Sequence, residues 1–215
     1  MKNKQLKMIF QQIPVGQMQN FSYLIADEKT KEAAVVDPAW ENGKILEIAI
    51  KNKLKINKIL ITHTDFDHVE GVKEMADLTG AAVYVHKNGE KDIKKLGINK
   101  IKTINEGDEI DIGSIKISVL YTPGHKPSCV CFLFGTNKLL TGDTLFVEGC
   151  GRVDMPGGNI KKQWESLQRL KIMDGNIEVY PGHDYGSTPN STIKHEKESN
   201  PYLRCSSFKE FSSVR

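Results

Sequence analysis

The 215-residue chain is poor in cysteine and arginine and has no long apolar run. Four cysteines without a CxxC pair predict neither a disulfide framework nor a zinc knuckle, which favours a reducing, cytoplasmic location. Four arginines and scattered lysines give a net charge of +3 but no basic stripe, so nucleic acid is not an expected partner. The longest apolar run, Cys129–Phe134, is too short to cross a membrane, and residues 1–12 lack the apolar core of an export signal.

The composition is that of a globular protein. Hydrophobic residues make up 39% of the chain and charged residues 27%, a balance that can bury a core and argues against a disordered chain. No repeat or low-complexity tract divides the sequence. We therefore expect one domain over residues 1–215, with about 191–215 as a short C-terminal appendage. The oligomeric state is not predicted.

Strand and helix patterns alternate along the chain. Runs of β-branched and apolar residues predict strands, and apolar spacing of three and four predicts helices. In the first half we expect strands at 21–26, 32–37, 57–62 and 81–85, and helices at 41–54 and 69–79. In the second half we expect hairpins over 109–121 and 129–141, a helix around 160–170, a strand at 177–180 and a helix after 191. This order predicts an α/β protein in which two sheets pack together with helices outside, a four-layer αββα sandwich.

Histidines and aspartates follow several of the predicted strands. Each lies in a turn that contains glycine or proline, or at the start of a helix, which is a common way to build an open metal site on a rigid scaffold. In an extended loop, residues at i and i+2 point the same way, so His63 and Asp65 can address one ion. Asp67 and His68, at the turn into the next helix, can then address a second ion. The full candidate set is His63, Asp65, Asp67, His68, His125, Asp143 and His183.

Five motifs, in order, give the sequence a resemblance to the metallo-β-lactamase-fold superfamily, and within it to small glyoxalase II-like (hydroxyacylglutathione hydrolase-like) and persulfide dioxygenase-like proteins. They are Thr62-His-Thr-Asp-Phe-Asp-His-Val-Glu-Gly71, Thr122-Pro-Gly-His125, Thr141-Gly-Asp-Thr-Leu-Phe146, Gly149-Cys-Gly-Arg152 and Pro181-Gly-His-Asp-Tyr-Gly186. The segment Asn200-Pro-Tyr-Leu203 is similar to the end of the compact hydrolases. The resemblance covers nearly the whole chain and implies the same αββα sandwich.

The resemblance also implies a ligand set for two divalent metal ions, zinc or iron, with manganese as a further candidate. One ion would be bound by His63, His125 and Asp143, with the residue at 65 as a further ligand. The second would be bound by Asp67, His68 and His183, with Asp143 bridging. In this family pattern Asp67 is the catalytic residue that orients the attacking hydroxide.

The sequence departs from the family pattern at one position. The family motif is His-x-His-x-Asp-His, and Asp65 stands where that motif has its second histidine. Asp65 could bind the metal through oxygen, which adds negative charge and favours iron or manganese over zinc. It could instead miss the metal and hydrogen-bond a histidine ligand, which leaves His63, His125 and Asp143 as two histidines and one carboxylate. A third reading is a substitution that weakens the site.

The favoured function is hydrolysis of a thioester-like (hydroxyacyl-thiol) small molecule by metal-bound hydroxide. The alternative is a persulfide dioxygenase with one Fe(II), in which Arg152 meets a substrate carboxylate; Arg152 could equally pair with Asp154. Tyr185 either borders the pocket or packs in the structure. A lactonase and a non-catalytic binding module on the same scaffold are further alternatives. No Gly-x-Ser-x-Gly motif supports a serine nucleophile.

Overall fold

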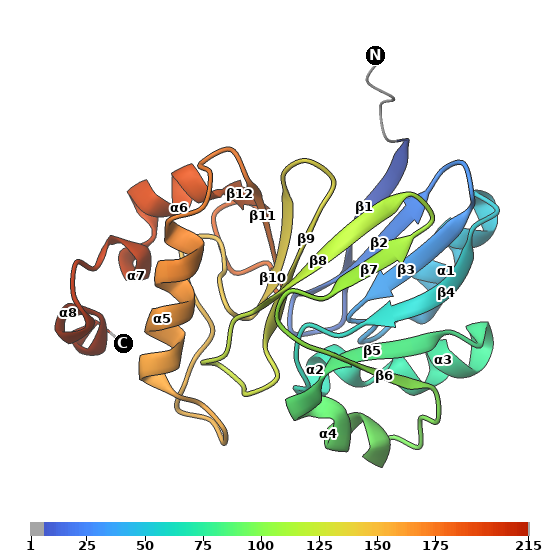
Figure 1. The fold of residues 1–215 in the computed structure, drawn as a ribbon, viewed down its shortest axis with the longest axis horizontal. Helices are drawn as coiled ribbons and strands as arrows, with labels where there is room; N and C mark the ends of the chain where they lie inside the picture. Colours follow the sequence, from blue (N-terminus) through green and yellow to red (C-terminus); the bar gives the residue numbers. More distant parts are fainter. Residues whose placement is uncertain (1–6, 215) are drawn as a thin grey trace.

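The computed structural model describes residues 7–214, and within them the chain builds two six-stranded sheets (Figure 1). The prediction that residues 1–12 carry no export signal falls partly outside the described residues. The first sheet has the strand order β1-β2-β3-β4-β5-β6, and the second has the order β12-β11-β10-β9-β8-β7. The strands of the first sheet are β1 (Met8–Val15), β2 (Asn20–Asp27), β3 (Glu32–Val36), β4 (Lys55–Leu60), β5 (Ala82–His86) and β6 (Ile101–Ile104).

The second sheet and the helices complete the architecture. Its strands are β7 (Glu109–Ile112), β8 (Ile115–Tyr121), β9 (Val130–Phe134), β10 (Lys138–Gly142), β11 (Glu178–Pro181) and β12 (Ser191–Thr192). The helices of the first half are α1 (Asn42–Lys51), α2 (Phe66–Val69), α3 (Val72–Thr79) and α4 (Glu90–Lys95), with a 3-10 turn at Lys87–Gly89. The helices of the second half are α5 (Ile160–Lys171), α6 (Ile193–Ser199), α7 (Pro201–Arg204) and α8 (Phe208–Ser213).

The two sheets face each other across a shared apolar layer. Side chains of the first sheet, such as Tyr23 and Ile25, pack there with side chains of the second, such as Val119 and Phe132. Along β8 the alternation places Ile115, Ile117 and Val119 in this layer, as period-two patterning requires.

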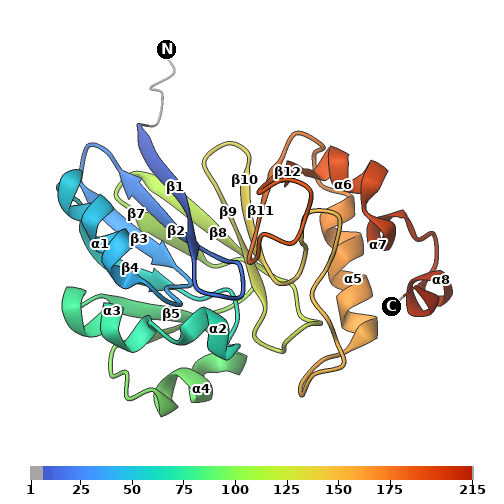
Figure 2. The same cartoon turned by 180° about the vertical axis from the view of Figure 1, so that it is seen from behind.

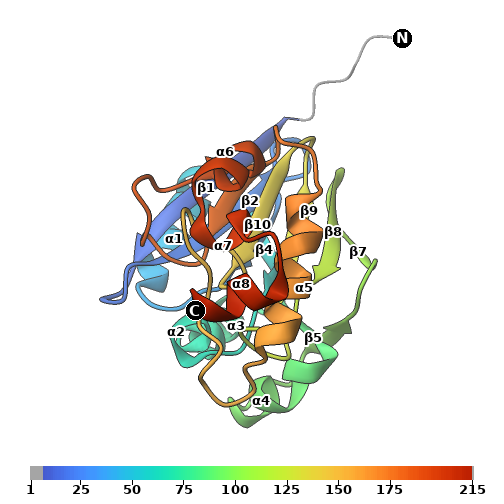
Figure 3. The same cartoon turned by 90° about the vertical axis from the view of Figure 1, so that its left-hand side faces the viewer.

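Helices cover the outer face of each sheet. Helices α1 to α4 lie on one side of the molecule and α5 to α8 on the other, as the front and back views show (Figures 1 and 2). Seen from the side, α5, α7 and α8 stand in front of the second sheet (Figure 3). Their apolar residues form a separate core with that sheet, in which Leu167, Leu170 and Phe211 are buried. The predicted αββα sandwich is confirmed.

The elements that were not predicted include β1, β6, β12 and α4. Strands β1 and β6 are the two edges of the first sheet, and an edge strand needs less apolar sequence because one side has no neighbouring strand. Strand β1 therefore tolerates Gln11, Gln12 and Pro14. The predicted 41–54 helix ends at Lys51. The predicted appendage, about 191–215, is described to residue 214; it adds β12 to the sheet and packs α6 to α8 near α5. None of the described helices is long and apolar enough to cross a membrane.

Candidate metal centre

The seven predicted site residues all follow strands of the two sheets and converge between them. Strand β4 ends at Leu60, and its loop and α2 supply four of the residues: His63, Asp65, Asp67 and His68. His125 follows β8, Asp143 follows β10 and His183 follows β11. Because β10 and β11 run parallel, their carboxyl ends lie at the same edge of the second sheet. The fold thus brings together residues separated by up to 120 positions in the sequence.

One half of the cluster gathers two imidazoles and two carboxylates. The Oδ2 atom of Asp65 lies 3.0 Å from Nε2 of His125 and 3.9 Å from Nε2 of His63. The Oδ2 atom of Asp143 lies 3.7 Å from Nε2 of His125 and 3.9 Å from Nε2 of His63. His63, Asp65 and His125 therefore offer ligand atoms close enough to hold one cation.

The other half shares Asp143 with the first. The Nε2 atoms of His68 and His183 are 3.2 Å apart, and Oδ2 of Asp67 lies 3.3 Å from Nε2 of His183 and 3.6 Å from Nε2 of His68. Asp143 presents Oδ1 to His68 and Oδ2 to His183, each at 3.3 Å. Asp67, His68 and His183 form a second group able to hold a cation, and Asp143 lies between the two groups.

The atoms are spaced as ligands of a small cation are. Ligand atoms at about 2.1 Å from a tetrahedral ion are about 3.4 Å apart, close to the separations of 3.2 to 3.9 Å in the second group and around Asp143. Nε2 of His63 and Oδ1 of Asp143 are buried and have no hydrogen-bond partner among the described residues. An unpaired buried polar atom is costly, and a divalent cation would satisfy both atoms. The residues present fit the metal site that the motifs imply.

The ionised carboxylates of the cluster also favour binding of a cation. Burial would raise the pKa of Asp143, but the charges of His68 and His63 and a hydrogen bond from His183 hold it well below its usual value. For His183, burial acts in the opposite direction and lowers the pKa, but hydrogen bonds to Asp143 and Asp67 outweigh burial and raise that pKa to about 9. His63 differs, because burial and the neighbouring His68 lower its pKa to about 3. The carboxylates are thus ionised and attract positive charge to the centre of the cluster.

Backbone carbonyls fix the tautomers of two of the histidines. Nδ1 of His125 donates a hydrogen bond to the carbonyl of Arg152 at 2.6 Å, and Nδ1 of His183 donates to the carbonyl of Met18 at 2.9 Å. A carbonyl can only accept, so in the neutral ring the proton sits on Nδ1 and the lone pair of Nε2 points into the cluster. This is the orientation that a metal-binding imidazole needs.

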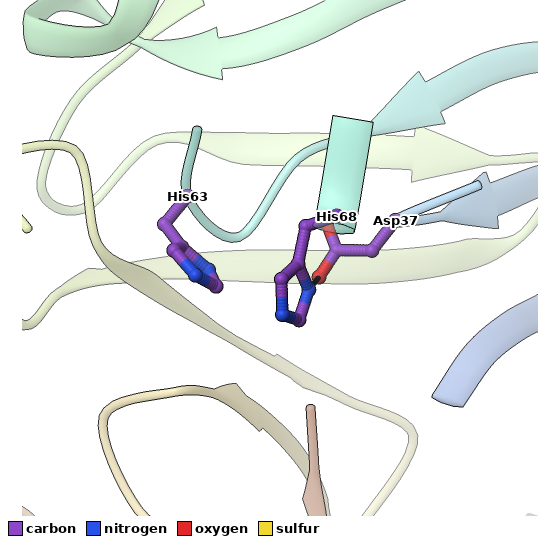
Figure 4. A group of neighbouring side chains, drawn as sticks. All are labelled: Asp37, His63 and His68. Atoms are coloured by element: carbon purple, nitrogen blue, oxygen red, sulfur yellow. Dashed lines mark hydrogen bonds and ion pairs between the residues drawn. The ribbon is translucent and has the colours of Figure 1, made fainter. Parts of the chain in front are cut away.

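Asp37, which the sequence analysis did not select, fixes the other two histidines. Its Oδ2 accepts from Nδ1 of His68 at 3.1 Å and from the hydroxyl of Thr62 at 2.5 Å (Figure 4 shows the bond to His68). The hydroxyl of Thr62 in turn accepts from Nδ1 of His63 at 3.0 Å. One buried carboxylate therefore orients both imidazoles. Asp37 directly follows strand β3, the same signal that identified the other residues, but it stands outside the histidine motifs.

Replacing Asp37 by asparagine is expected to lower divalent metal affinity by about ten- to a hundredfold. The reason is that the amide has one acceptor oxygen in place of two, while the imidazole of His68 and the hydroxyl of Thr62 both donate to this side chain. Affinity is measured by competition with a coloured chelator. Asp27→Asn is the matched control: Asp27 is also a buried aspartate at a strand end that accepts backbone N–H bonds, but it contacts Ser114 and not the cluster. Equal metal affinity in the two variants would contradict the role assigned to Asp37.

Asp65 points into the cluster and not behind it. A residue that supports histidine ligands from outside would bond their Nδ1 atoms, but those of His63 and His125 are occupied by Thr62 and Arg152. Asp65 instead reaches the Nε2 side with Oδ2 while Oδ1 pairs with Lys126 Nζ at 2.6 Å.

The pair between Asp65 and Lys126 is largely shielded from solvent. Their side chains are 20% and 17% exposed. Burial acts to raise the pKa of Asp65, but hydrogen bonds from His125 and Lys126 and the charge of His63 lower it to about 2. Lys126 was not anticipated from the sequence, since no motif marks a cation next to His125.

The cluster lies at the floor of a cavity of about 550 Å³ that opens to solvent. Its wall includes Phe146 and Tyr185, and the ring of Tyr185 stacks on that of His183 with ring centroids 4.5 Å apart, so Tyr185 both lines the cavity and packs against the cluster; its contact with a substrate stays a prediction. Arg152 also lines the cavity, but its guanidinium makes two 2.6 Å hydrogen bonds to the carboxylate of Asp154. Its contact with a substrate stays a prediction.

Glycine is required where Asp143 approaches the chain after β11. A Cβ on Gly182 would lie 2.3 Å from Oδ1 of Asp143 and 2.9 Å from Cε1 of His68, a contact that neither group can avoid without leaving the cluster. The glycine in the Pro-Gly-His motif thus allows the bridging carboxylate and the last histidine to lie together.

Three further side chains, outside the cluster, hold the loops of the centre in place. The buried side chain of Gln163 on α5 accepts from the backbone N–H of His125 and donates to the carbonyl of Thr144, each at 2.8 Å. The amide of Asn200 donates to the carbonyl of Gly149 at 3.0 Å, and Glu196 accepts from the N–H of Glu148 at 2.8 Å. The C-terminal helices therefore fix the 146–149 turn beside the cavity.

The remaining two histidines lie outside the cluster. His86 is buried and stacks on Tyr121 with ring centroids 4.1 Å apart, and His195 pairs with Glu148 at 3.1 Å.

A two-sheet αββα sandwich with a His/Asp cluster at the strand ends defines a class of metal-site proteins, and the comparison with known families agrees. Residues 15–183 match the model of the metallo-beta-lactamase superfamily, so the chain belongs to this superfamily. The resemblance inferred from the motifs is confirmed.

Individual relatives are similar over most of the chain. The "Probable polyketide biosynthesis zinc-dependent hydrolase PksB" of Bacillus subtilis is 32% identical over 197 residues, which are 91% of this chain and 87% of that protein. A "Hydroxyacylglutathione hydrolase" of Francisella tularensis subsp. novicida is 38% identical over 170 residues, 78% of this chain and 64% of that one. The crystal structure of ETHE1 from Myxococcus xanthus superposes with a TM-score of 0.87 at 32% identity, covering 96% of this chain and 89% of that one.

Proposed function

We propose that this chain is a metal-dependent hydrolase of thioester-like substrates that works at a dinuclear His/Asp centre. The observation that carries the proposal is the convergence of four imidazoles and three carboxylates, with inward Nε2 atoms, at the floor of an open cavity. Two similar proteins named as hydrolases support it, one of them as zinc-dependent.

We assign one cation to His63, Asp65, His125 and Asp143, and a second to Asp67, His68 and His183 with Asp143 shared. Nitrogen and carboxylate donors of this kind suit zinc and iron. Cations bound there would lower the pKa of a water molecule toward neutrality and polarise the carbonyl of the substrate.

Asp67 is the catalytic residue that we assign to orienting the attacking water. Its Oδ2 accepts a hydrogen bond from Nδ2 of Asn20 at 3.0 Å, which fixes the carboxylate at the edge of the cavity. Burial acts to raise its pKa, but a hydrogen bond from His183 and the charge of His68 hold that pKa well below its usual value. The carboxylate is therefore ionised at pH 7 and can accept a hydrogen bond from an attacking water and orient it.

A second candidate is a mononuclear iron persulfide dioxygenase. Two observations favour it: the similarity to the ETHE1 structure, and the subset His63, His125 and Asp143, which is the two-histidine, one-carboxylate set of non-haem iron oxygenases.

Three measurements on protein purified without chelators distinguish these functions. They are elemental analysis, hydrolysis of S-lactoylglutathione and of simpler acyl thioesters, and oxygen uptake with glutathione persulfide. Two metal ions per chain and hydrolysis of a thioester without oxygen uptake are expected. One iron with oxygen uptake would favour the dioxygenase, and a chain that binds no metal would overturn both enzymatic proposals.

A further inference from the structure

A second hollow of about 720 Å³ adjoins the metal-centre cavity. It is lined by the β1–β2 turn, the segment before α1 and the start of α2, with the residues Gly16, Gln17, Met18, Trp40, Glu41 and Phe66. Met18 and Phe66 line both hollows. The two hollows therefore adjoin at these two side chains, and we call the second hollow the Trp40 groove.

The surface of the Trp40 groove is mainly apolar. The rings of Trp40 and Phe66 meet edge to face with centroids 6.4 Å apart. Phe66 is 62% exposed and Met18 is 40% exposed, although both adjoin the polar cluster. Single exposed apolar side chains are ordinary, but several together at the mouth of a cavity are typical of a ligand site.

The groove is held in shape by its own contacts. Gly16 has φ +69°, and a Cβ there would lie 2.0 Å from the Trp40 ring, so only glycine lets the ring pack against the turn. The backbone N–H of Gly16 donates to Glu41 at 2.9 Å, and Lys44 pairs with the other oxygen of Glu41 at 2.6 Å. The one carboxylate in the groove is thus engaged in joining the turn to the segment before α1.

The charges beside the groove indicate what it can bind. Among residues 7–214, no lysine or arginine lines the Trp40 groove. The two such residues on the wall of the neighbouring cavity, Lys126 and Arg152, are paired with Asp65 and Asp154. An arm with several carboxylates, such as that of glutathione, would find no unpaired cation in the groove, whereas an uncharged apolar arm would bury its surface against Trp40 and Phe66.

We propose that the Trp40 groove binds an uncharged, apolar arm of the thioester substrate while the carbonyl lies over the metal centre. This inference rests on the proposed hydrolase function and adds the class of substrate. The arm could be the acyl chain or the thiol side of the thioester, and both place the same apolar chemistry in the groove.

The test is a series of thioesters that differ in one arm at a time. With N-acetylcysteamine as the common thiol, acetyl, butanoyl, hexanoyl and octanoyl esters lengthen the acyl arm; acetyl esters of ethanethiol and hexanethiol lengthen the thiol arm. We expect kcat/KM to rise roughly two- to fourfold per methylene in one of the two arms. The arm that shows the rise occupies the groove. No rise in either arm, or a preference for S-lactoylglutathione over every apolar ester, would overturn the proposal.

Trp40→Ala tests the residues of the groove. We expect it to reduce kcat/KM for the preferred long ester at least tenfold more than for the acetyl ester, and Trp40→Phe to restore most of the difference. Leu78→Ala, on the exposed face of α3 and away from the groove, is the control and should leave the series unchanged. Equal losses for long and short esters in Trp40→Ala would contradict the assignment.

A binding measurement separates this proposal from the hydrolase proposal. A hexyl thioether analogue, which cannot be hydrolysed, is titrated into metal-free protein by calorimetry. If the wild type binds the analogue and Trp40→Ala weakens this binding at least fivefold, the groove proposal is supported. If in the same protein no ester is hydrolysed, that failure counts against the hydrolase proposal and not against the groove. If the wild type does not bind the analogue and kcat/KM does not change along the ester series, but the acetyl ester is still hydrolysed, the groove proposal is overturned and the hydrolase proposal stands.

Discussion

Asp143→Asn is expected to lower the hydrolysis of thioesters about a thousandfold or more and to reduce the metal content below one ion per chain. Asp143 is the only described residue whose carboxylate lies within 4 Å of all four imidazoles of the cluster. An asparagine keeps the shape but removes the negative charge that both proposed cations share, and a less tightly held cation lowers the pKa of water less effectively. Elemental analysis and initial rates measured on the same preparation check both effects.

Asp184→Asn is the matched control for this variant. Asp184 is exposed and follows His183 directly, so the same chemical change is made close to the centre but outside the cluster. We expect full metal content and activity within twofold of the wild type. An Asp143→Asn protein that keeps two ions and full activity would show that Asp143 does not bridge the cations.

The pair formed by Asp65 and Lys126 predicts the second large effect. Asp65→His, which restores the family pattern, is expected to shift metal preference toward zinc because an imidazole replaces a harder oxygen donor. The same change removes the carboxylate that lies 2.6 Å from Lys126 Nζ and leaves this ammonium group unpaired beside the proposed cation site. We therefore expect Asp65→His alone to bind zinc about five- to tenfold more weakly than the double variant Asp65→His, Lys126→Met.

A double-mutant cycle measures this coupling. Zinc and iron dissociation constants are determined by chelator competition for the wild type, the two single variants and the double variant. Lys126→Met alone should bind divalent cations more tightly, since the carboxylate of Asp65 then lacks its fixed counter-charge. Identical zinc-to-iron selectivity in all four proteins would show that Asp65 does not touch a cation, and strict additivity would show that Lys126 does not offset its charge.

The fold could be predicted from sequence where one face of an element packs against a core and the opposite face is more exposed. Strand β8, with Ile115, Ile117 and Val119 on one face, and the apolar positions of α5 gave clear periods because each packs against a core. Strands β1 and β6 escaped prediction because an edge strand pairs on one side only, so little in their composition distinguishes them from loops.

The sequence predicted which residues form the candidate centre, but not the hydrogen bonds and ion pairs that other residues make with them. The turns after strands located the seven candidate residues because a rigid strand end is where a fold exposes polar side chains. Asp37 lies at such a strand end too, but a lone Asp-Pro dipeptide reads as a turn until its contacts with Thr62 and His68 are seen. Lys126 could not be found, since its pairing with Asp65 depends on two loops that meet only in the folded chain.

The hydrogen bonds of Asn200 and Glu196 to the 146–149 turn have a consequence for biosynthesis. A ribosome makes the chain from the N-terminus, so β1 to β6 and the first four candidate ligands emerge long before His183. The turn beside the cavity gains its last supports only when residues 196 and 200 have also emerged. The nascent protein therefore cannot acquire the complete proposed centre before residues 183, 196 and 200 have left the ribosome, and any metal loading of that centre would follow this point.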